Sequence, residues 1–173
     1  MEIKRIDQAN RAFVDEFILR KWYTMEMVVH GERIDLGSAD GWFASDGIAS
    51  EKIASEKIAG EDGEIVGLIT YRISGDEMEI LSLDSLKENR GIGSRLLGEA
   101  VEEARRVGCT RVMLITTNDN LHALRFYQKR GFDMVRIYRN AVDESRKIKP
   151  EIPLIGDNGI PIKHEIEMEM KIE

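Results

Sequence analysis

A pair of glycines at the start of a strongly amphipathic segment is the first place where this chain could bind a ligand. Gly91 and Gly93 follow a strand-like segment and open a helix predicted over residues 92–107. The first turn of a helix leaves backbone N–H groups without partners and is electropositive. Because glycine lacks a Cβ atom, a phosphate can approach those amides, and Arg90 and Arg95 would add positive charge. The pattern indicates phosphate binding; the alternative is that the glycines only allow close packing of helix and strand.

Two common nucleotide-binding motifs do not match this segment. A P-loop needs four residues between its glycines and a following Gly-Lys-Ser/Thr, which this segment lacks. A dinucleotide-binding fingerprint places its first glycine at the end of the strand and a third glycine three residues after the second. Here Gly91 comes seven positions after Asp84, and Leu96 occupies the place of the third glycine. The spacing therefore excludes both motifs.

A second informative segment lies at residues 114–132, where a short apolar strand precedes a helix predicted over 120–129. From Asn120 to Phe132 it reads Asn-x-x-Ala-x-x-Phe-Tyr-x-x-x-Gly-Phe. Together with the glycine-pair helix and the strand between them, this pattern resembles the GNAT family of acetyl-CoA-dependent N-acetyltransferases. The resemblance covers residues 64–138.

The resemblance implies that acetyl-CoA is the acyl donor and that no metal is needed. The family's pyrophosphate loop, Gln/Arg-x-x-Gly-x-Gly/Ala, falls on residues 88–93. Glu88 departs from it, so its carboxylate is expected to turn away while a neighbouring arginine compensates. The main chain of residues 81–83 corresponds to the strand that pairs with the pantetheine arm, and an amide there polarises the thioester carbonyl. The residues expected to bind acetyl-CoA are Leu81, Ser82, Leu83, Asn89, Arg90, Gly91, Ile92, Gly93, Ser94, Arg95, Asn120 and Tyr127.

Tyr127 matches the family tyrosine that donates a proton to the departing thiolate. A thiolate with a pKa of about 8.5 benefits from a nearby phenol donor. The attacking amine, with a pKa of about 10.4, is neutral only about once in a thousand molecules at pH 7, so a second group must accept its proton. The residues alone also allow Tyr127 to be a core aromatic residue beside Phe126.

The motif does not identify the group that accepts the amine proton. Some relatives carry a carboxylate five residues before the motif asparagine, but here that position is Ile115. Glu79 is the catalytic candidate, with Glu77 on the same predicted strand. The alternatives are that Glu79 is only solvated, or that a water chain leads to a more distant carboxylate. Helix-capping positions are expected for Asn118 and Asp119, and surface or interface positions for His30, His122 and His164.

The chain alternates between strand-like and helix-like periods, which indicates an α/β (α+β) protein. The resemblance implies the GNAT fold, a mixed central sheet of about six to seven strands flanked by about four helices, with splayed central strands holding CoA. A length of 173 residues favours a single domain over 1–173. Its cofactor core is expected at 64–138, followed by a C-terminal excursion and a closing strand over 139–173. A tandem pentapeptide at 48–57 indicates only a local duplication in a loop.

The acceptor is expected opposite the cofactor. Surfaces from the N-terminal helix, residues 31–50 and residues 139–163 would form its site. The first of these ranges is rich in glycine, which indicates a loop, and Trp42 and Phe43 would suit a binding loop. Residues 152–162 are apolar and rich in turn formers, so they form either a lid over the cleft or a structural hairpin.

Composition narrows the remaining classes of function. With 25 Lys and Arg against 32 Asp and Glu, the net charge of −7 gives no reason to expect a nucleic-acid partner. No apolar run reaches the roughly 18–20 residues that cross a bilayer, so no membrane partner is expected. The N-terminal residues do not resemble a signal peptide, and the single Cys109 fits a reducing cytoplasm. One cysteine and three histidines are too few for a structural zinc site.

These observations predict an acyltransferase that moves an acetyl group from acetyl-CoA to a primary amine of a small molecule or peptide, by direct attack in a ternary complex. The alternative is a GNAT-fold module that binds or senses acyl-CoA without turnover, which the departures at Glu88 and Ile115 keep open. The sequence leaves the identity of the amine and the oligomeric state open, a homodimer included.

Overall fold

The computed structural model describes residues 1–46, 63–87 and 90–173, so the tandem pentapeptide, Glu88 and Asn89 lie outside the described residues. Seven strands form one sheet in the order β1-β4-β5-β6-β7-β9-β8, and β2 and β3 form a separate hairpin. The strands are β1 (Glu2–Arg5), β2 (Glu26–Val29), β3 (Glu32–Asp35), β4 (Asp40–Asp46), β5 (Glu64–Ser74), β6 (Glu77–Ser85), β7 (Arg111–Thr117), β8 (Asp133–Tyr138) and β9 (Glu165–Lys171). The helices are α1 (Arg11–Trp22), α2 (Ile92–Val107), α3 (Leu121–Gln128) and α4 (Ala141–Ile148), with a short 3-10 turn at Leu36–Ser38.

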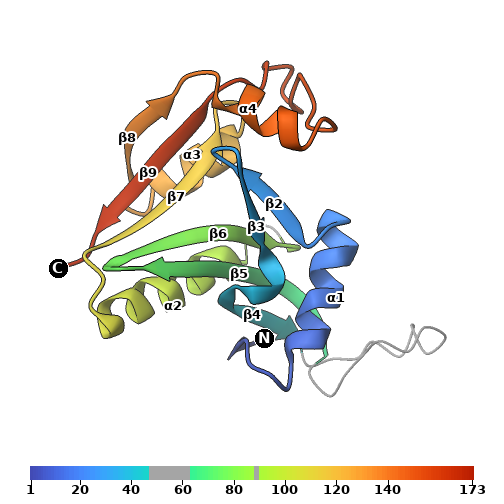
Figure 1. Ribbon diagram of the computed structural model, residues 1–173. Helices are drawn as coiled ribbons and strands as arrows, with labels where there is room; N and C mark the ends of the chain where they lie inside the picture. Colours follow the sequence, from blue (N-terminus) through green and yellow to red (C-terminus); the bar gives the residue numbers. More distant parts are fainter. Residues whose placement is uncertain (47–62, 88–89) are drawn as a thin grey trace.

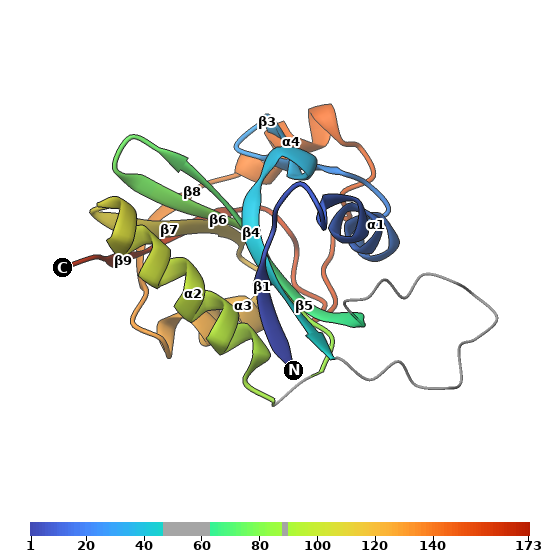
Figure 2. The same cartoon turned by 90° about the horizontal axis from the view of Figure 1, so that it is seen from below.

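Helices cover both faces of the sheet, as Figures 1 and 2 show. Leu96 and Ala100 of α2 and Tyr127 of α3 join one core cluster with the strands. Val14 and Ile18 of α1 belong to a second cluster, which the β2–β3 hairpin helps to cover. The sheet is mixed because β6 and β7 pair in parallel, joined by the α2 crossover, while the other pairs are antiparallel. The α/β class predicted from the sequence is confirmed, as is a mixed sheet of the expected size, with seven strands in the main sheet and four helices in the described part of the chain.

The two central strands β6 and β7 separate part-way along their length. Their parallel pairing ends at Ile80 and Leu114. Beyond that point β6 stays paired with β5 as far as Ser85, and β7 stays paired with β9 as far as Thr117. The β5–β6 register shifts at Leu81, an extra residue in β6, and a bulge of this kind bends a strand and increases its twist. The facing edges of β6 and β7 therefore have no strand partner beyond the bulge.

The glycine-rich segment around residues 31–46 is not the binding loop that we expected. It contains β3 and β4, and in β4 both Trp42 and Phe43 are buried in the core. Gly41 supplies the reason: a Cβ atom there would lie 2.0 Å from the carbonyl oxygen of Ile69 on the neighbouring strand β5. The glycine therefore allows two strands to approach closely, which the sequence pattern did not distinguish from a loop.

Residues 152–162 form a structural excursion. Arg146 of α4 donates hydrogen bonds to three carbonyl groups of this segment. An isolated β-bridge joins Ile155 to Pro161 across its turn. No residue of the segment lines the cleft between β6 and β7. The structure therefore supports the hairpin interpretation over the lid.

Candidate active site

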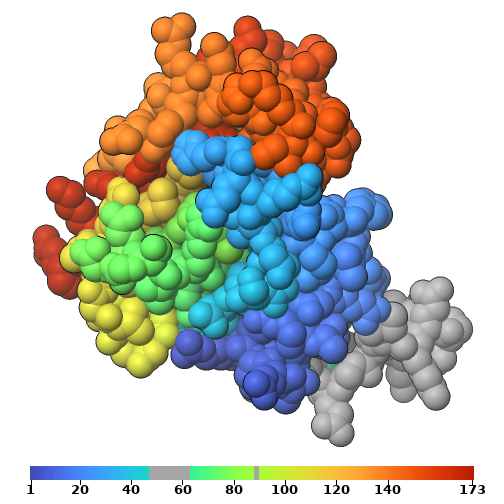
Figure 3. Space-filling view, in the orientation of Figure 1, coloured from blue at the N-terminus to red at the C-terminus, as the bar shows by residue number. Residues whose placement is uncertain are grey.

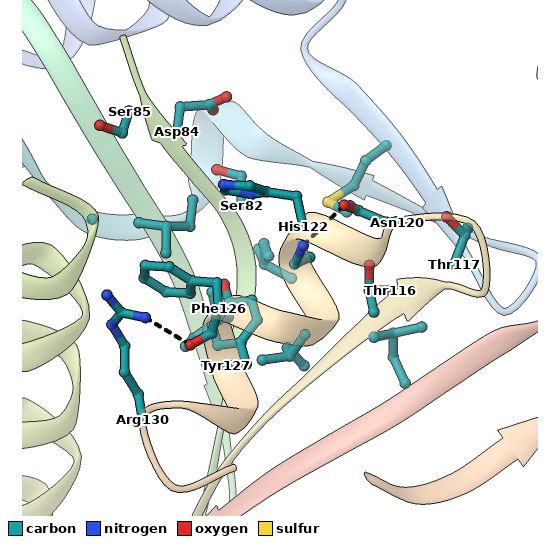
Figure 4. A pocket seen from close by; sticks show the side chains of 18 of the residues that line it. Ser82, Asp84, Ser85, Thr116, Thr117, Asn120, His122, Phe126, Tyr127 and Arg130 are labelled. Carbon is teal, nitrogen blue, oxygen red and sulfur yellow. Dashed lines mark hydrogen bonds between the residues drawn. The ribbon is translucent and has the colours of Figure 1, made fainter. Parts of the chain in front are cut away.

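A cleft of about 670 Å³ lies where β6 and β7 diverge. The two strands form its walls, together with the first turn of α2 and the inner side of α3. On the opposite side it is bounded by Trp22 at the end of α1 and by β2. Figure 4 shows the polar and aromatic side chains that line it: Ser82, Asp84 and Ser85 of β6, Thr116 and Thr117 of β7, and Asn120, His122, Phe126, Tyr127 and Arg130 on and around α3.

The main chain of β6 forms one wall of the cleft. Leu81, Ser82 and Leu83 all line it, in the positions predicted for pairing with the pantetheine arm. Because pairing with β7 stops at Ile80, the backbone groups on this edge have no strand partner. The Oγ of Ser82 shares a 2.7 Å hydrogen bond with Oγ1 of Thr70, which holds this hydroxyl within the sheet. An extended ligand can therefore add to β6 through main-chain hydrogen bonds.

The N-terminus of α2 opens into the same cleft. Gly91 is its N-cap, with φ of +71°, a conformation that glycine adopts without strain. Within the described part of the chain no side chain caps the helix, and residues 92–94 line the cleft with the amides of the first turn. Gly93 lies against α3, since a Cβ atom there would stand 3.4 Å from the ring of Phe126. The two interpretations of the glycine pair thus apply to different glycines, one shaping the helix start and the other allowing close packing.

Arg130 brings a positive charge to the start of α2. Its Nε and Nη2 donate hydrogen bonds of 3.0 and 2.5 Å to Oγ of Ser94, and its Nη1 donates to the carbonyl oxygen of Phe126 at 2.7 Å. The guanidinium also lies 3.6 Å from the centre of the Phe126 ring. A basic residue at the end of a helix ordinarily indicates only a favourable interaction with the helix dipole, so the local sequence held no signal for this position.

The arginines predicted for the pyrophosphate loop are not in the cleft. Arg90 and Arg95 are both exposed and are not among its lining residues. Asn89, the remaining predicted residue of the loop, lies outside the described residues. Among the described residues, Arg130 and Lys87 are the basic side chains that line the cleft, and Lys87 forms an ion pair with Asp46.

Tyr127 lies inside the cleft with 6% of its surface exposed. Its ring packs edge-on against Phe126 and Phe132, with centroid distances of 5.1 and 5.2 Å. Burial raises the pKa of Tyr127, and the charge of Asp84 raises it further, while Arg130 acts in the opposite direction. The phenol is therefore protonated at neutral pH, as a hydrogen-bond and proton donor must be.

Asn120 caps α3, and it also lines the cleft. Its Oδ1 accepts a 3.1 Å hydrogen bond from the N–H of Ala123. The expectation that Asn118 or Asp119 caps this helix was wrong, because the side chain of Asn118 instead binds the backbone of residues 161–164. Since capping uses the oxygen of Asn120, its Nδ2 amino group is the part that can donate to a ligand.

Glu79, the candidate base on β6, does not line the cleft. It lies on the part of β6 that is still paired with β7, opposite Met113. Its carboxylate accepts a 2.6 Å hydrogen bond from Nε of Arg72, which also pairs with Glu32. The lining side chains that the sequence did not predict include Trp22, Asp84, His122, Arg130 and Glu165.

Asp84 is a carboxylate near the end of β6 with 9% of its surface exposed. Its Oδ2 accepts a 3.0 Å hydrogen bond from Nε1 of Trp22. Burial raises the pKa of Asp84, against the opposing effects of the Trp22 hydrogen bond and the charge of Lys21. Nothing in the local sequence indicates this contact, because Trp22 and Asp84 are 62 residues apart.

The β2–β3 hairpin closes the side of the cleft opposite α3. Residues 27–29 of β2 line the cleft with apolar side chains. At the hairpin turn, Nδ1 of His30 lies 2.6 Å from Oε2 of Glu165 at the start of β9, and the backbone N–H of His30 donates to the same carboxylate. The hydroxyl of Ser145 in α4 donates to Glu165 from the other side. Figure 3 shows the result, the light-blue hairpin lying against the orange C-terminal segment.

A sequence profile of the acetyltransferase (GNAT) family matches residues 18–132. The chain belongs to the GNAT family of acetyltransferases. Two uncharacterized proteins of Bacillus subtilis (strain 168) are each 42% identical to it: YdhI, over 87% of this chain and 86% of the relative, and YxbD, over 92% and 91%.

Solved structures share the fold of this acetyltransferase. An IAA acetyltransferase from Bacillus cereus is 22% identical with a TM-score of 0.67, and the match covers 98% of both chains. A Bacillus subtilis acetyltransferase in complex with CoA is 17% identical with a TM-score of 0.66, covering 99% of both chains. Together with the family match, these similarities confirm the predicted enzyme class. Among the described helices, none combines the length and apolar composition needed to cross a membrane.

Proposed function

We propose that this acetyltransferase, acting as a single domain over residues 1–173, moves an acetyl group from acetyl-CoA to a primary amine of a small molecule or peptide. The observation that carries the proposal is the pair of separate surfaces that meet in one cleft. The open edge of β6 and the start of α2 suit an extended phosphate-bearing donor. Trp22, β2 and two carboxylates suit a cationic acceptor.

Direct attack of the amine on acetyl-CoA in a ternary complex is favoured over an acetylated enzyme, because in the part of the chain that the structure describes the cleft offers no cysteine to carry the acetyl group. Cys109, the single cysteine, is buried and does not line the cleft. Ser82 does line it, but its hydroxyl is held by Thr70. None of the described residues that line the cleft is therefore a cysteine, the nucleophile that would most readily take the acetyl group first. The amine therefore attacks the thioester itself.

The fit of acetyl-CoA rests on three features. The first-turn amides of residues 92–94, with Arg130 beside them, would hold the pyrophosphate, since unpartnered N–H groups and positive charge favour an anion. The backbone of residues 81–83 would pair with the pantetheine arm, and an amide there would polarise the thioester carbonyl. The Nδ2 group of Asn120 would donate to the same arm. Asn89, Arg90 and Arg95 remain predictions for the outer end of the donor.

Tyr127 would serve as the proton donor. Its phenol is buried beside the open edge of β6, where the thioester sulfur would lie. As the C–S bond breaks, the thiolate takes the electron pair, and a proton from Tyr127 stabilises it. The raised pKa of Tyr127 keeps the phenol protonated until that moment.

Replacing Tyr127 by phenylalanine tests this role. We expect Y127F to lower kcat for thiol release by about 100-fold on a panel of primary amines, because general acid catalysis contributes about 10²–10⁴-fold. The KM for acetyl-CoA should change little, since the aromatic ring remains. Y23F is the matched control, because Tyr23 is 90% exposed and is not among the lining residues.

Binding of the donor is tested separately from turnover. Acetyl-CoA at 100 times its dissociation constant should add about 2.7 kcal/mol of stability. For a chain of this length each kcal/mol raises Tm by about 2–4 °C. Absence of any Tm shift would contradict the donor site. A clear shift without thiol release on any amine would favour the acyl-CoA-binding module instead.

A further inference from the structure

The proposed reaction needs a group that accepts the proton of the incoming ammonium. Glu79 is outside the cleft and held by Arg72. Of the two carboxylates that line the cleft, Glu165 already bonds to His30 and Ser145. Asp84 has a different environment, since Trp22 is the one described residue that donates a hydrogen bond to it. That bond goes to Oδ2, so Oδ1 has no donor among the described residues and can accept another hydrogen bond.

We propose that Asp84 is the general base of this acetyltransferase and that it selects a cationic alkylamine with an apolar body as the acceptor. This inference rests on the N-acetyltransferase function proposed above. It goes further by naming the residue that takes the proton, the residue that positions it, and the chemical class of the amine.

Asp84 and Tyr127 reach the cleft from opposite faces of the sheet. Trp22 of α1 donates a hydrogen bond to Asp84, whereas Tyr127 belongs to α3. These two helices cover opposite faces of the sheet (Figure 1). Both side chains line the cleft beside the open edge of β6. The charge of Asp84 also contributes, after burial, to raising the pKa of Tyr127. A base and an acid thus approach the same stretch of strand from its two faces, as attack by one group and departure of another require.

The charges around Asp84 favour a cationic ligand. The titratable groups facing it are Lys21 from α1, Tyr127 and His122 from α3, Lys87 after β6 and Glu165 across the cleft. In the described part of the chain no cation forms an ion pair with Asp84, and Lys87 is engaged by Asp46. The charge of Lys21 offsets the burial of Asp84 only in part, and a buried carboxylate without an ion pair is unfavourable, so an ammonium ligand is stabilised beside it.

An apolar surface lines the acceptor side of the cleft that Asp84 also lines. The Trp22 side chain and residues 27–29 of β2 bound the acceptor side of the cleft. An aromatic face attracts a cation, and aliphatic side chains favour an apolar body behind it. Asp84 would at the same time repel a carboxylate next to the amine, so an amine without that group is preferred to the corresponding α-amino acid.

The proton and electron balance of the step is simple. Asp84 takes one proton from the ammonium, and the neutral nitrogen forms the N–C bond to the acetyl carbon. The C–S bond breaks, the sulfur leaves with the electron pair, and it takes the proton of Tyr127. The second proton of the nitrogen returns to Tyr127, and Asp84 releases its proton to solvent. The products are the amide, the free thiol and one proton.

The decisive experiment measures thiol release by D84N with acetyl-CoA and two acceptors, phenethylamine and an arylamine that is neutral at pH 7. With phenethylamine we expect kcat/KM to fall by about 10²–10³-fold at pH 7, a loss in the range of general base catalysis. The deficit should shrink as the pH approaches the ammonium pKa of about 10.4, where the amine loses its proton without help. With the neutral arylamine the deficit should be below about tenfold. A purely structural role for Asp84 would lower activity equally at every pH and for both amines.

Two further variants provide a control for D84N and test the hydrogen bond from Trp22. D133N removes an exposed carboxylate in β8 by the same chemical change and should match wild type. W22F keeps an aromatic ring but removes the donor to Asp84. Because that hydrogen bond lowers the pKa of Asp84, W22F should move the acidic limb of the wild-type pH profile to higher pH. Phenethylamine should exceed phenylalanine in kcat/KM by more than about tenfold in wild type, and less in D84N.

The outcomes separate the two proposals. Wild-type turnover that D84N leaves unchanged, or that E79Q lowers more than D84N does, overturns the assignment of Asp84 alone. An equal deficit with both amines at all pH values also overturns it. Failure of the wild type to release thiol with any amine overturns the N-acetyltransferase function and this assignment together.

Discussion

At the scale of single residues, Gly91 and Gly98 of the α2 region have different roles. Gly91 has φ of +71°, and a Cβ atom there would meet nothing within 4 Å, so alanine would introduce conformational strain without a clash. We expect G91A to lower the free energy of unfolding by about 1–2 kcal/mol. Because Gly91 also directs the first-turn amides, acetyl-CoA affinity should fall by about tenfold, equivalent to about 1.4 kcal/mol. Urea unfolding and titration calorimetry measure the two effects.

Gly98 provides the control for that variant. It also has open space around it, but its backbone is ordinary helix. G98A should raise the free energy of unfolding by about 0.5–1 kcal/mol, since alanine favours a helix interior, and should leave acetyl-CoA affinity unchanged. Wild-type affinity in G91A would contradict the role of this glycine in shaping the anion site.

The site residues that could be predicted from the sequence are those that belong to a short motif. Gly91, Gly93 and Tyr127 belong to short patterns with fixed spacing, and all three line the cleft. Glu79 and Asp84 are both carboxylates of β6, and no local feature separates them. What separates them is tertiary: the point where pairing with β7 ends and the contact of Asp84 with α1.

At the scale of elements, the sequence predicted an element correctly where particular residues mark both of its ends. The helix predicted over 92–107 matches α2, because an amphipathic stripe lies between Gly91 and Gly108, both with positive φ. The prediction of a loop was wrong for β3 and β4, because Gly41 allows β4 to approach β5 closely and does not mark a turn. The divergence of β6 and β7 was expected only from the family resemblance, since a bulge at Leu81 leaves no mark in an alternating pattern.

The β2–β3 hairpin is the element on which acceptor binding should depend. Its turn is held by His30 against Glu165, while β2 lines only the side of the cleft away from α2. H30A keeps the backbone N–H of residue 30 and removes the contact of Nδ1 with Glu165, and losing one hydrogen bond of about 0.5–1.5 kcal/mol should loosen the hairpin. We therefore expect H30A to raise KM for the acceptor by about 3–10-fold, with acetyl-CoA affinity unchanged, in steady-state kinetics and calorimetry.

A surface pair on the same hairpin provides the comparison. Glu26 and Arg33 form a 2.7 Å ion pair between two exposed side chains, away from the turn. Exposed pairs contribute about 0–1 kcal/mol, so E26Q should keep wild-type KM values for both substrates. If H30A weakened acetyl-CoA binding as much as acceptor binding, the hairpin would not be specific to the acceptor side.

At the scale of the whole molecule, a base placed in the interior should lower the stability of the fold. Asp84 lies between the α1 face and the open strand edge, so in the absence of ligand its charge is buried, and no ion pair to it is formed within the described residues. Asparagine keeps the acceptor for Nε1 of Trp22 and removes the charge. D84N should therefore be more stable than wild type at neutral pH while losing activity.

The pH dependence of this gain follows from the direction of the pKa shift. Burial raises the pKa of folded Asp84 above the ordinary value of about 3.9, so wild type loses stability as the pH rises through the raised value. Below the ordinary value the carboxyl is neutral in both states, and the two proteins should have the same Tm. Above the raised value the gain should be constant, about 2–4 °C in Tm for each kcal/mol. Calorimetry of wild type, D84N and D133N across this range measures it. A wild type more stable than D84N at neutral pH would mean that the Trp22–Asp84 contact exists to hold α1 to the sheet rather than to serve the reaction.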